Sequence, residues 1–108
     1  MLTFKQLQEE QIVWVNHNFP NFEHWEPLVG AMEEIGELAH HHLKGHQGIR
    51  GGWDHHIPQC ADAVADIIIY LANYCTAMNI DLQDAIETTW NDVKRRDWQK
   101  DSVNGGAS

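Results

Sequence analysis

Apolar residues recur with the period of an α-helix in four segments of the chain. They predict helices over residues 3–17, 27–44, 58–78 and 82–98. Thr3 followed by Gln6 has the form of a capping box at the start of the first helix, and Asp81 suits the cap of the fourth. No segment alternates apolar and polar residues as a strand would. The chain is therefore predicted to be all-α, a small bundle of four main helices.

Proline and glycine place the boundaries of the second and third helices. Pro27 suits the first turn of a helix, and Gly45 suits the position just past a helix end. The segment from Gly45 to Pro58 holds too much glycine for regular structure, so Pro58 is expected to open the third helix. We expect one domain over residues 1–100 and a disordered tail over residues 101–108.

The second and third helices differ in how their apolar residues are distributed. The apolar face of the second helix is formed by Leu28, Ala31, Met32, Ile35, Leu38 and Ala39. Three acids lie nearly opposite that face: Glu33, Glu34 and Glu37. Apolar residues occupy most of the circumference of the third helix, which predicts a buried helix. That helix nevertheless carries Asp62 and Asp66 on one face, with Asn73 further along the same stripe.

The chain is strongly acidic, with 16 acidic residues against 7 Lys and Arg and a formal net charge of -9. Such a chain repels nucleic acid and anionic membranes, so neither is expected as a partner. No Lys or Arg occurs over residues 6–43 or 51–93. Two carboxylates about 5 Å apart repel by roughly 3 kcal/mol at an effective dielectric of 20. We therefore expect a divalent cation between the helices, which would offset this repulsion. Carboxylate ligands without thiolates favour Mg²⁺, with Mn²⁺ as a substitute, over zinc.

Cysteine content and the N-terminal sequence indicate the compartment. Two cysteines are too few for a disulfide framework. The N-terminal residues are polar, which does not suit a signal peptide, and no wholly apolar run reaches the roughly 18 residues of a membrane span. We therefore expect a cytoplasmic protein.

Two motifs in the predicted second and third helices carry a family resemblance. The sequence EEIGEL over residues 33–38, followed by DAVADIIIYL over residues 62–71, resembles the metal motif of the MazG-like, all-α nucleoside triphosphate pyrophosphohydrolases. In that family the motif is Glu-Glu-x-x-Glu and then Glu-x-x-Asp, and the likeness extends over residues 27–98. The resemblance implies that Mg²⁺ holds the phosphates of an NTP or dNTP while water attacks, giving the monophosphate and pyrophosphate.

Matching the motif position by position assigns roles to the acids. Glu34, Glu37 and Asp66 match metal ligands. Glu33 matches the leading acid, a water-orienting group, so that Glu33 and Glu34 are the candidate catalytic residues. The chain departs from the pattern at one point, because the Glu of the second motif corresponds to Ala63. Asp62, one position earlier on the face of Asp66, is expected to act as a shifted ligand.

Basic residues outside the acidic segments are the candidates for binding phosphate. Lys44 and Arg50 belong to the glycine-rich segment after the second helix, and Lys94 and Arg96 to the end of the fourth. Arg96 matches a base of the family, and Asn73 is a further candidate for binding substrate. A cationic helix end that complements the helix dipole is the alternative for the C-terminal pair.

Two other functions remain open on the sequence alone. Glu37 and His40 form one Glu-x-x-His of the kind found in di-iron helical bundles, although a second copy is absent. A non-catalytic helical interaction module is also conceivable, but it leaves the acids of the apolar third helix without a role. Members of the MazG-like family assemble as dimers or tetramers, so the resemblance implies a homodimer or homotetramer that shares the apolar third helix between subunits.

Overall fold

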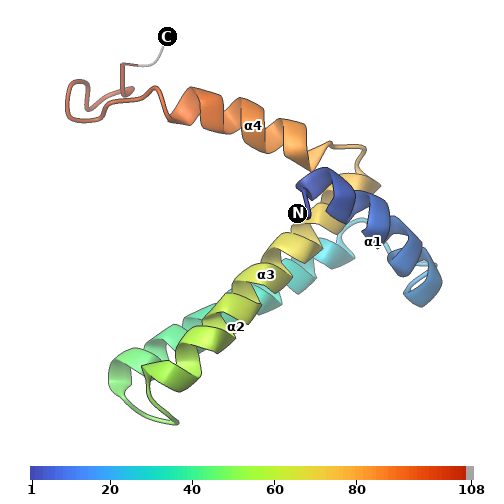
Figure 1. The fold of residues 1–108 in the computed structure, drawn as a ribbon, viewed down its shortest axis with the longest axis horizontal. Coiled ribbons are helices and arrows are strands. Elements are labelled where there is room, and N and C mark those ends of the chain that lie inside the picture. The colour runs from blue at the N-terminus through green and yellow to red at the C-terminus, as the bar shows by residue number, and fades with distance from the viewer. Residues whose placement is uncertain (107–108) are drawn as a thin grey trace.

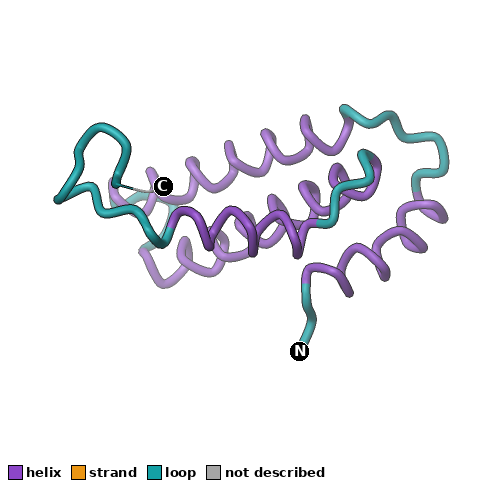
Figure 2. Tube along the Cα trace, turned by 90° about the horizontal axis from the view of Figure 1, so that it is seen from above, coloured by secondary structure: helices purple, strands orange, loops and turns teal. Residues whose placement is uncertain are grey.

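The structure, a computed structural model, describes residues 1–106, which contain four α-helices and no strand (Figure 1). The helices are α1 (Phe4–Asn18), α2 (Glu26–Gln47), α3 (Trp53–Ala77) and α4 (Leu82–Val93). Figure 2 shows the same helices joined by short loops, with a longer loop before the C-terminus. The prediction of an all-α chain with four main helices is confirmed.

Helices α2 and α3 lie side by side as an antiparallel hairpin, and this pair is the main packed unit (Figure 1). The buried and half-buried residues of α2 include a stripe formed by Pro27, Ala31, Glu34, Leu38, His41 and Gly45. Its spacing alternates between four and three residues, which is the spacing of a seam between two nearly parallel or antiparallel helices. This stripe shares Ala31 and Leu38 with the apolar face predicted for the second helix, but the rest of that face is exposed. Of that face, Met32 is 71% exposed and Ile35 is 52% exposed.

Helix α1 packs near the open end of the hairpin and is held there by glutamine side chains. The Nε2 group of Gln8 donates to the carbonyl oxygen of Ile80 at 2.9 Å, and Gln11 Nε2 donates to the carbonyl oxygen of Ile69 at 2.7 Å. Helix α4 contacts α1, with Phe4 N–H donating to Gln83 Oε1 at 3.2 Å, and projects away from the hairpin (Figure 1).

The apolar core of the described chain is small. Its buried hydrophobic residues are Val15, Ala31, Ala63, Ala72 and Cys75. The Cα radius of gyration is 17.4 Å, whereas a compact domain of this length has about 13 Å. Much of α3 is exposed because only α2 and α1 cover it. The prediction that the third helix is buried is therefore wrong for the single chain.

The boundaries at the α2–α3 connection differ from the sequence prediction. Helix α2 continues through Gly45 to Gln47 and is capped by Gly48, whose φ of 70° places it in the left-handed region that favours glycine. Gly45 is buried instead against the indole of Trp53, where an added Cβ would lie 2.5 Å from ring atoms. Helix α3 begins at Trp53, so Pro58 lies inside it and does not open it.

The predicted caps are confirmed. Thr3 Oγ1 accepts from Gln6 N–H at 3.1 Å, and the Gln6 side chain accepts from Thr3 N–H at 2.9 Å. Asp81 Oδ1 accepts from Asp84 N–H at 3.0 Å at the start of α4. Helix α4 ends at Val93, several residues before the predicted end.

The C-terminal segment follows turns as far as the structure describes it. In the segment for which disorder is predicted, residues 102–106 form a series of turns, and Asp97 N–H donates to the carbonyl oxygen of Gly105 at 2.6 Å. Residues 107–108 of that segment lie outside the described residues.

One helix among residues 1–106, α3, is long and apolar enough to cross a membrane by length and composition. Core helices of soluble proteins pass the same test, so this property does not decide between the two environments.

Candidate functional site

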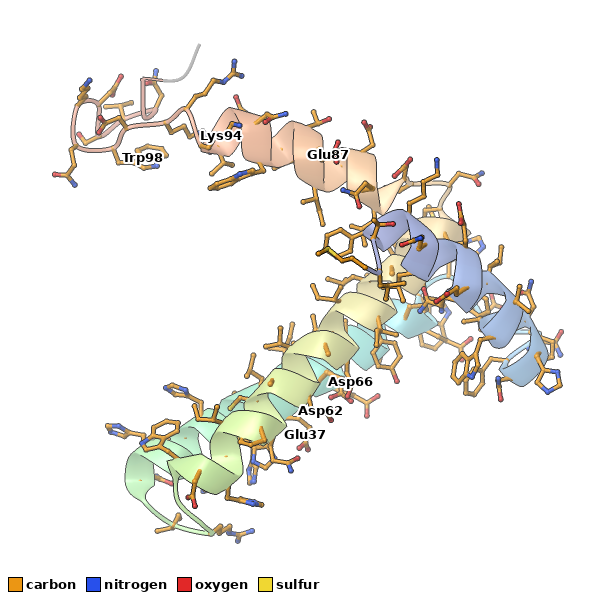
Figure 3. All side chains as sticks on the ribbon, in the orientation of Figure 1. Glu37, Asp62, Asp66, Glu87, Lys94 and Trp98 are labelled. Atoms are coloured by element: carbon orange, nitrogen blue, oxygen red, sulfur yellow. The ribbon has the colours of Figure 1, made fainter. Side chains whose placement is uncertain are left out.

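Five carboxylates from two helices gather along the α2–α3 hairpin. Glu33, Glu34 and Glu37 come from α2, and Asp62 and Asp66 come from α3. Figure 3 shows the side chains of Glu37, Asp62 and Asp66 along one edge of the hairpin. We call these five residues the acidic face.

Burial and the neighbouring carboxylates both act on Glu34. Partial burial raises the pKa of Glu34, and the charges of Asp66, Glu37, Asp62 and Glu33 raise it further, in that order. Because carboxylates of both helices act on this one group, the hairpin brings the two sequence motifs together. Glu34 therefore holds its proton more tightly than an ordinary glutamic acid does.

The acids are less buried than the sequence pattern predicts. Asp62 is exposed and Asp66 is half-buried, whereas Ala63 between them is only 3% exposed. Ala63 packs at the helix interface, so Asp62 and Asp66 lie toward its solvent edge. The expectation of buried aspartates is wrong because α3 is covered on part of its circumference only.

The side chains as placed do not form a chelate. Among residues 1–106, no group of three or more His, Cys, Asp or Glu side chains is arranged to hold a metal ion. The donor set of the acidic face is nevertheless all carboxylate oxygen, which is the chemistry that Mg²⁺ and Mn²⁺ prefer. Glu34, Glu37, Asp62 and Asp66 remain the predicted ligands.

An aromatic pocket of about 550 Å³ adjoins the acidic face. Its aromatic lining residues are Phe19, Phe22, Trp25 and Tyr70. Its polar lining residues are Asn21, Glu26, Glu33 and Asn73. Glu33 belongs to both the pocket and the acidic face, so the two are contiguous. Asn73, predicted to bind substrate, lies in this pocket.

The sequence prediction did not identify most of this pocket. The aromatic residues of the segment NFPNFEHWEP, residues 18–27, were the available signal, but Tyr70 comes from the middle of α3. Gly30 completes the arrangement, because a Cβ at that position would overlap the ring of Tyr70.

The predicted phosphate-binding bases lie apart from the acidic face in the single chain. Lys44 donates to Gln47 Oε1 at 3.3 Å near the end of α2, and Arg50 lies in the loop at the closed end of the hairpin. Arg96 pairs with Asp92 at 2.8 Å beyond α4, and Figure 3 shows Lys94 at the same remote end of the molecule. Within one chain, the structure does not bring these bases to the acids.

The histidine nearest to an acid is not the one in the Glu-x-x-His motif. His41 Nε2 lies 3.8 Å from Glu37 Oε2, while His40 stacks edge-on against the ring of His41. The described contacts therefore link Glu37 to His41, four residues along the helix.

Comparison of the chain with protein-family models, with curated proteins and with solved structures finds no match in any of the three. The family resemblance consequently stands on the two motifs and their spacing.

Proposed function

We propose that this protein is a Mg²⁺-dependent nucleoside triphosphate pyrophosphohydrolase of the MazG-like type, which converts an NTP or dNTP into the monophosphate and pyrophosphate. The observation that carries the proposal is the contiguity of two features. An acidic face from two helices adjoins a pocket lined by aromatic rings and an amide. The first suits a metal-bound triphosphate, and the second suits a nucleobase.

The acidic face supplies the charge that a divalent cation needs. Glu34, Glu37, Asp62 and Asp66 would hold Mg²⁺, and the ion would neutralise the charge of the triphosphate. Burial and the neighbouring negative charges raise the pKa of Glu34, and a bound cation would neutralise those charges, which favours binding. Glu33, which lines the pocket, would orient the attacking water.

The aromatic pocket supplies the surface for the base. Trp25 and Tyr70 offer rings for stacking, and the side-chain amide of Asn73 offers both a donor and an acceptor to the edge of a base. Because Glu33 lies between this pocket and the other acids, a nucleotide bound here would direct its phosphates toward the acidic face.

Self-association would cover the exposed apolar residues and would also bring the bases of one subunit to the acids of another. Met32 and Ile35 on α2 and Val64 on α3 are between 47% and 71% exposed. We propose that they are covered in a cytoplasmic homodimer or homotetramer. In such an assembly, Lys94 and Arg96 of one subunit can serve the acidic face of another.

The proposal is tested with a panel of NTPs and dNTPs in the presence of Mg²⁺, measuring the release of pyrophosphate and of phosphate separately. We expect pyrophosphate with the wild type and its loss by at least about tenfold in Asp66→Asn, because a neutral amide is a weaker ligand for a hard cation. Asp54→Asn is the matched control, since Asp54 lies on the same helix in its first turn, outside the acidic face.

Three outcomes would contradict the proposal. They are wild-type turnover in Asp66→Asn, release of phosphate in place of pyrophosphate, and an equal loss in Asp54→Asn. Iron-dependent consumption of oxygen without nucleotide cleavage would support the di-iron oxidase in its place. Asp66→Asn is expected to fold at least as stably as the wild type without metal, because it removes a repulsive charge.

A further inference from the structure

Both helices of the α2–α3 hairpin carry a second stripe of residues, one position beyond the stripe at their interface. On α2 the interface stripe includes Ala31, Leu38 and Gly45. The second stripe repeats the spacing of four and three residues and comprises Leu28, Met32, Ile35, Ala39, His42 and His46. All six residues are exposed in the single chain, and a groove of about 570 Å³ follows the stripe from Ile35 to His46.

The second stripe of α3 is apolar throughout. The interface stripe of this helix includes His56 and Ala63, which are both buried. One position further along, the second stripe comprises Ile57, Ala61, Val64 and Ile68. Ile57 is 57% exposed and Val64 is 47% exposed. Neither second stripe contains an Asp, Glu, Lys or Arg residue, so an apolar partner suits both better than a charged one.

The two second stripes face the same side of the hairpin. Successive residues of an α-helix are about 100° apart around its axis. Because α2 and α3 are antiparallel, a step of one residue along each helix turns in opposite senses when both are viewed from one end. The interface stripes face each other, so the two steps lead to the same side. We call the residues of the two second stripes the apolar face.

The acidic residues lie on the other side of the hairpin. Glu33 and Glu37 each precede an interface residue of α2 by one position, and Asp62 and Asp66 do the same on α3. A step backwards turns each helix the other way, so these four residues point away from the apolar face. Figure 3 shows Glu37, Asp62 and Asp66 along one edge of the hairpin. The hairpin thus has an acidic side and an apolar side.

Charge determines which surfaces of two identical chains can meet. The chain has a formal net charge of -9, so two copies repel wherever their acidic sides approach. When the copies meet through the apolar face, two layers of helices separate the acidic sides by about 20 Å, given a helix diameter of about 10 Å. This separation exceeds the Debye length of about 8 Å, so salt screens most of the repulsion. A second copy therefore fits the apolar face electrostatically.

The apolar face is also large enough for a stable contact. The stripe on α2 is about 27 Å long and that on α3 about 16 Å, at a rise of 1.5 Å per residue, and each is about 10 Å wide. Two copies packed over both stripes would bury roughly 1,000 Å² of accessible surface in total, the size at which specific interfaces begin.

We propose that two copies of the chain pair through the apolar face, hairpin on hairpin, as a four-helix bundle whose acidic faces lie on opposite outer sides. The pairing names the surface that carries the self-association proposed above, and it does not rest on nucleotide hydrolysis. The acidic face and the aromatic pocket, which share Glu33, stay open to substrate in this arrangement.

Sedimentation equilibrium of the full chain tests the pairing. We expect the wild type at twice the 12.4 kDa of one chain, or at a multiple of that pair. Val64→Glu and Ile35→Glu each place a carboxylate in the paired surface. Each should halve the mass and raise the Kd of pairing at least about a hundredfold, because an unpaired buried charge is unfavourable. Val13→Glu is the matched control, since Val13 is 71% exposed but lies on α1, and it should associate as the wild type does.

Thermal unfolding gives a second readout. The Tm of the wild type should rise with protein concentration, because pairing couples folding to the amount of chain present. Val64→Glu should lose this dependence. Its helix content by circular dichroism should match that of the wild type, since residue 64 is exposed in the single chain. This measurement distinguishes lost association from a failure to fold.

Four outcomes would overturn the pairing. They are a wild type that stays monomeric at every concentration, wild-type mass in both Val64→Glu and Ile35→Glu, an equal loss of association in Val13→Glu, and binding of a monomeric wild type to neutral phosphatidylcholine vesicles that Val64→Glu abolishes. The last outcome would assign the apolar face to a membrane. A monomer that cleaves nucleotide would refute the pairing alone, and a pair that cleaves none would refute the proposed function alone.

Discussion

Replacing Gly30 with alanine tests the packing that forms the aromatic pocket. Gly30 is buried on α2, and a Cβ added there would overlap the ring of Tyr70 on α3. Gly36 lies on the same helix, and a Cβ added there would meet nothing within 4 Å. The two glycines therefore offer the same chemical change in two different surroundings.

The expected magnitudes follow from this difference. Alanine is favoured over glycine inside a helix by about 1 kcal/mol, so Gly36→Ala should raise the free energy of unfolding by about that amount. Gly30→Ala makes the same gain but must displace the ring of Tyr70, and overpacking of this kind costs typically about 1–3 kcal/mol. Gly30→Ala should thus range from neutral to about 2 kcal/mol less stable than the wild type, and always less stable than Gly36→Ala.

Urea unfolding of the metal-free protein, followed by far-ultraviolet circular dichroism, measures both variants. Tyr70→Ala provides a further check, because Gly30→Ala in that background should stabilise as Gly36→Ala does. If Gly30→Ala is as stabilising as Gly36→Ala with Tyr70 present, the ring of Tyr70 does not pack against Gly30, and the proposed shape of the pocket is wrong.

Three further predictions concern the acidic face and the loop. The pKa of Glu34 is raised above its ordinary value of 4.5 in the folded protein, so the folded state binds more protons between the two values, and the free energy of unfolding should fall as pH rises through that window. Denaturant unfolding across acidic pH measures this slope, and Glu34→Gln should reduce it. A steeper fall of the free energy of unfolding in Glu34→Gln than in the wild type would contradict a raised pKa of Glu34. Arg50→Ala should raise the KM or lower the kcat for triphosphates, with Arg50→Lys recovering only part because it lacks the bidentate fork, and wild-type kinetics would make the loop a plain connector. Asp62→Ala should raise the Mg²⁺ concentration needed for half-maximal pyrophosphate release, and a titration like that of the wild type would remove Asp62 from the ligand set.

Features that depend on neighbouring residues were predictable from the sequence. The capping bonds of Thr3 and Asp81 each span three residues, so the sequence contains both partners. The all-α class followed from apolar periodicity for the same reason. The clustering of acids within each helix was also readable, because positions three or four residues apart share a face.

The tertiary structure alone decided which sides of the helices meet. The pattern favoured the face with Met32 and Ile35 as the packed side of α2, but the hairpin keeps Ala31 of that face and adds Gly45. Small residues let the helices approach closely, and this advantage depends on what α3 places opposite them. The sequence predicted that the second helix ends before Gly45, but Gly45 lies inside α2 and packs against Trp53. Trp53 is not a near neighbour in the sequence, so this contact could not be predicted from local pattern.

The candidate site divides in the same way. Each acidic motif could be found from its spacing, whereas the coupling of Glu34 to Asp66 required the two helices to dock. The pocket joins the α1–α2 loop to Tyr70, and a hydrogen bond joins His41 to His56 across the hairpin. Such contacts depend on the rotation of each helix about its axis, which local periodicity leaves undetermined and the packing of the opposite helix sets.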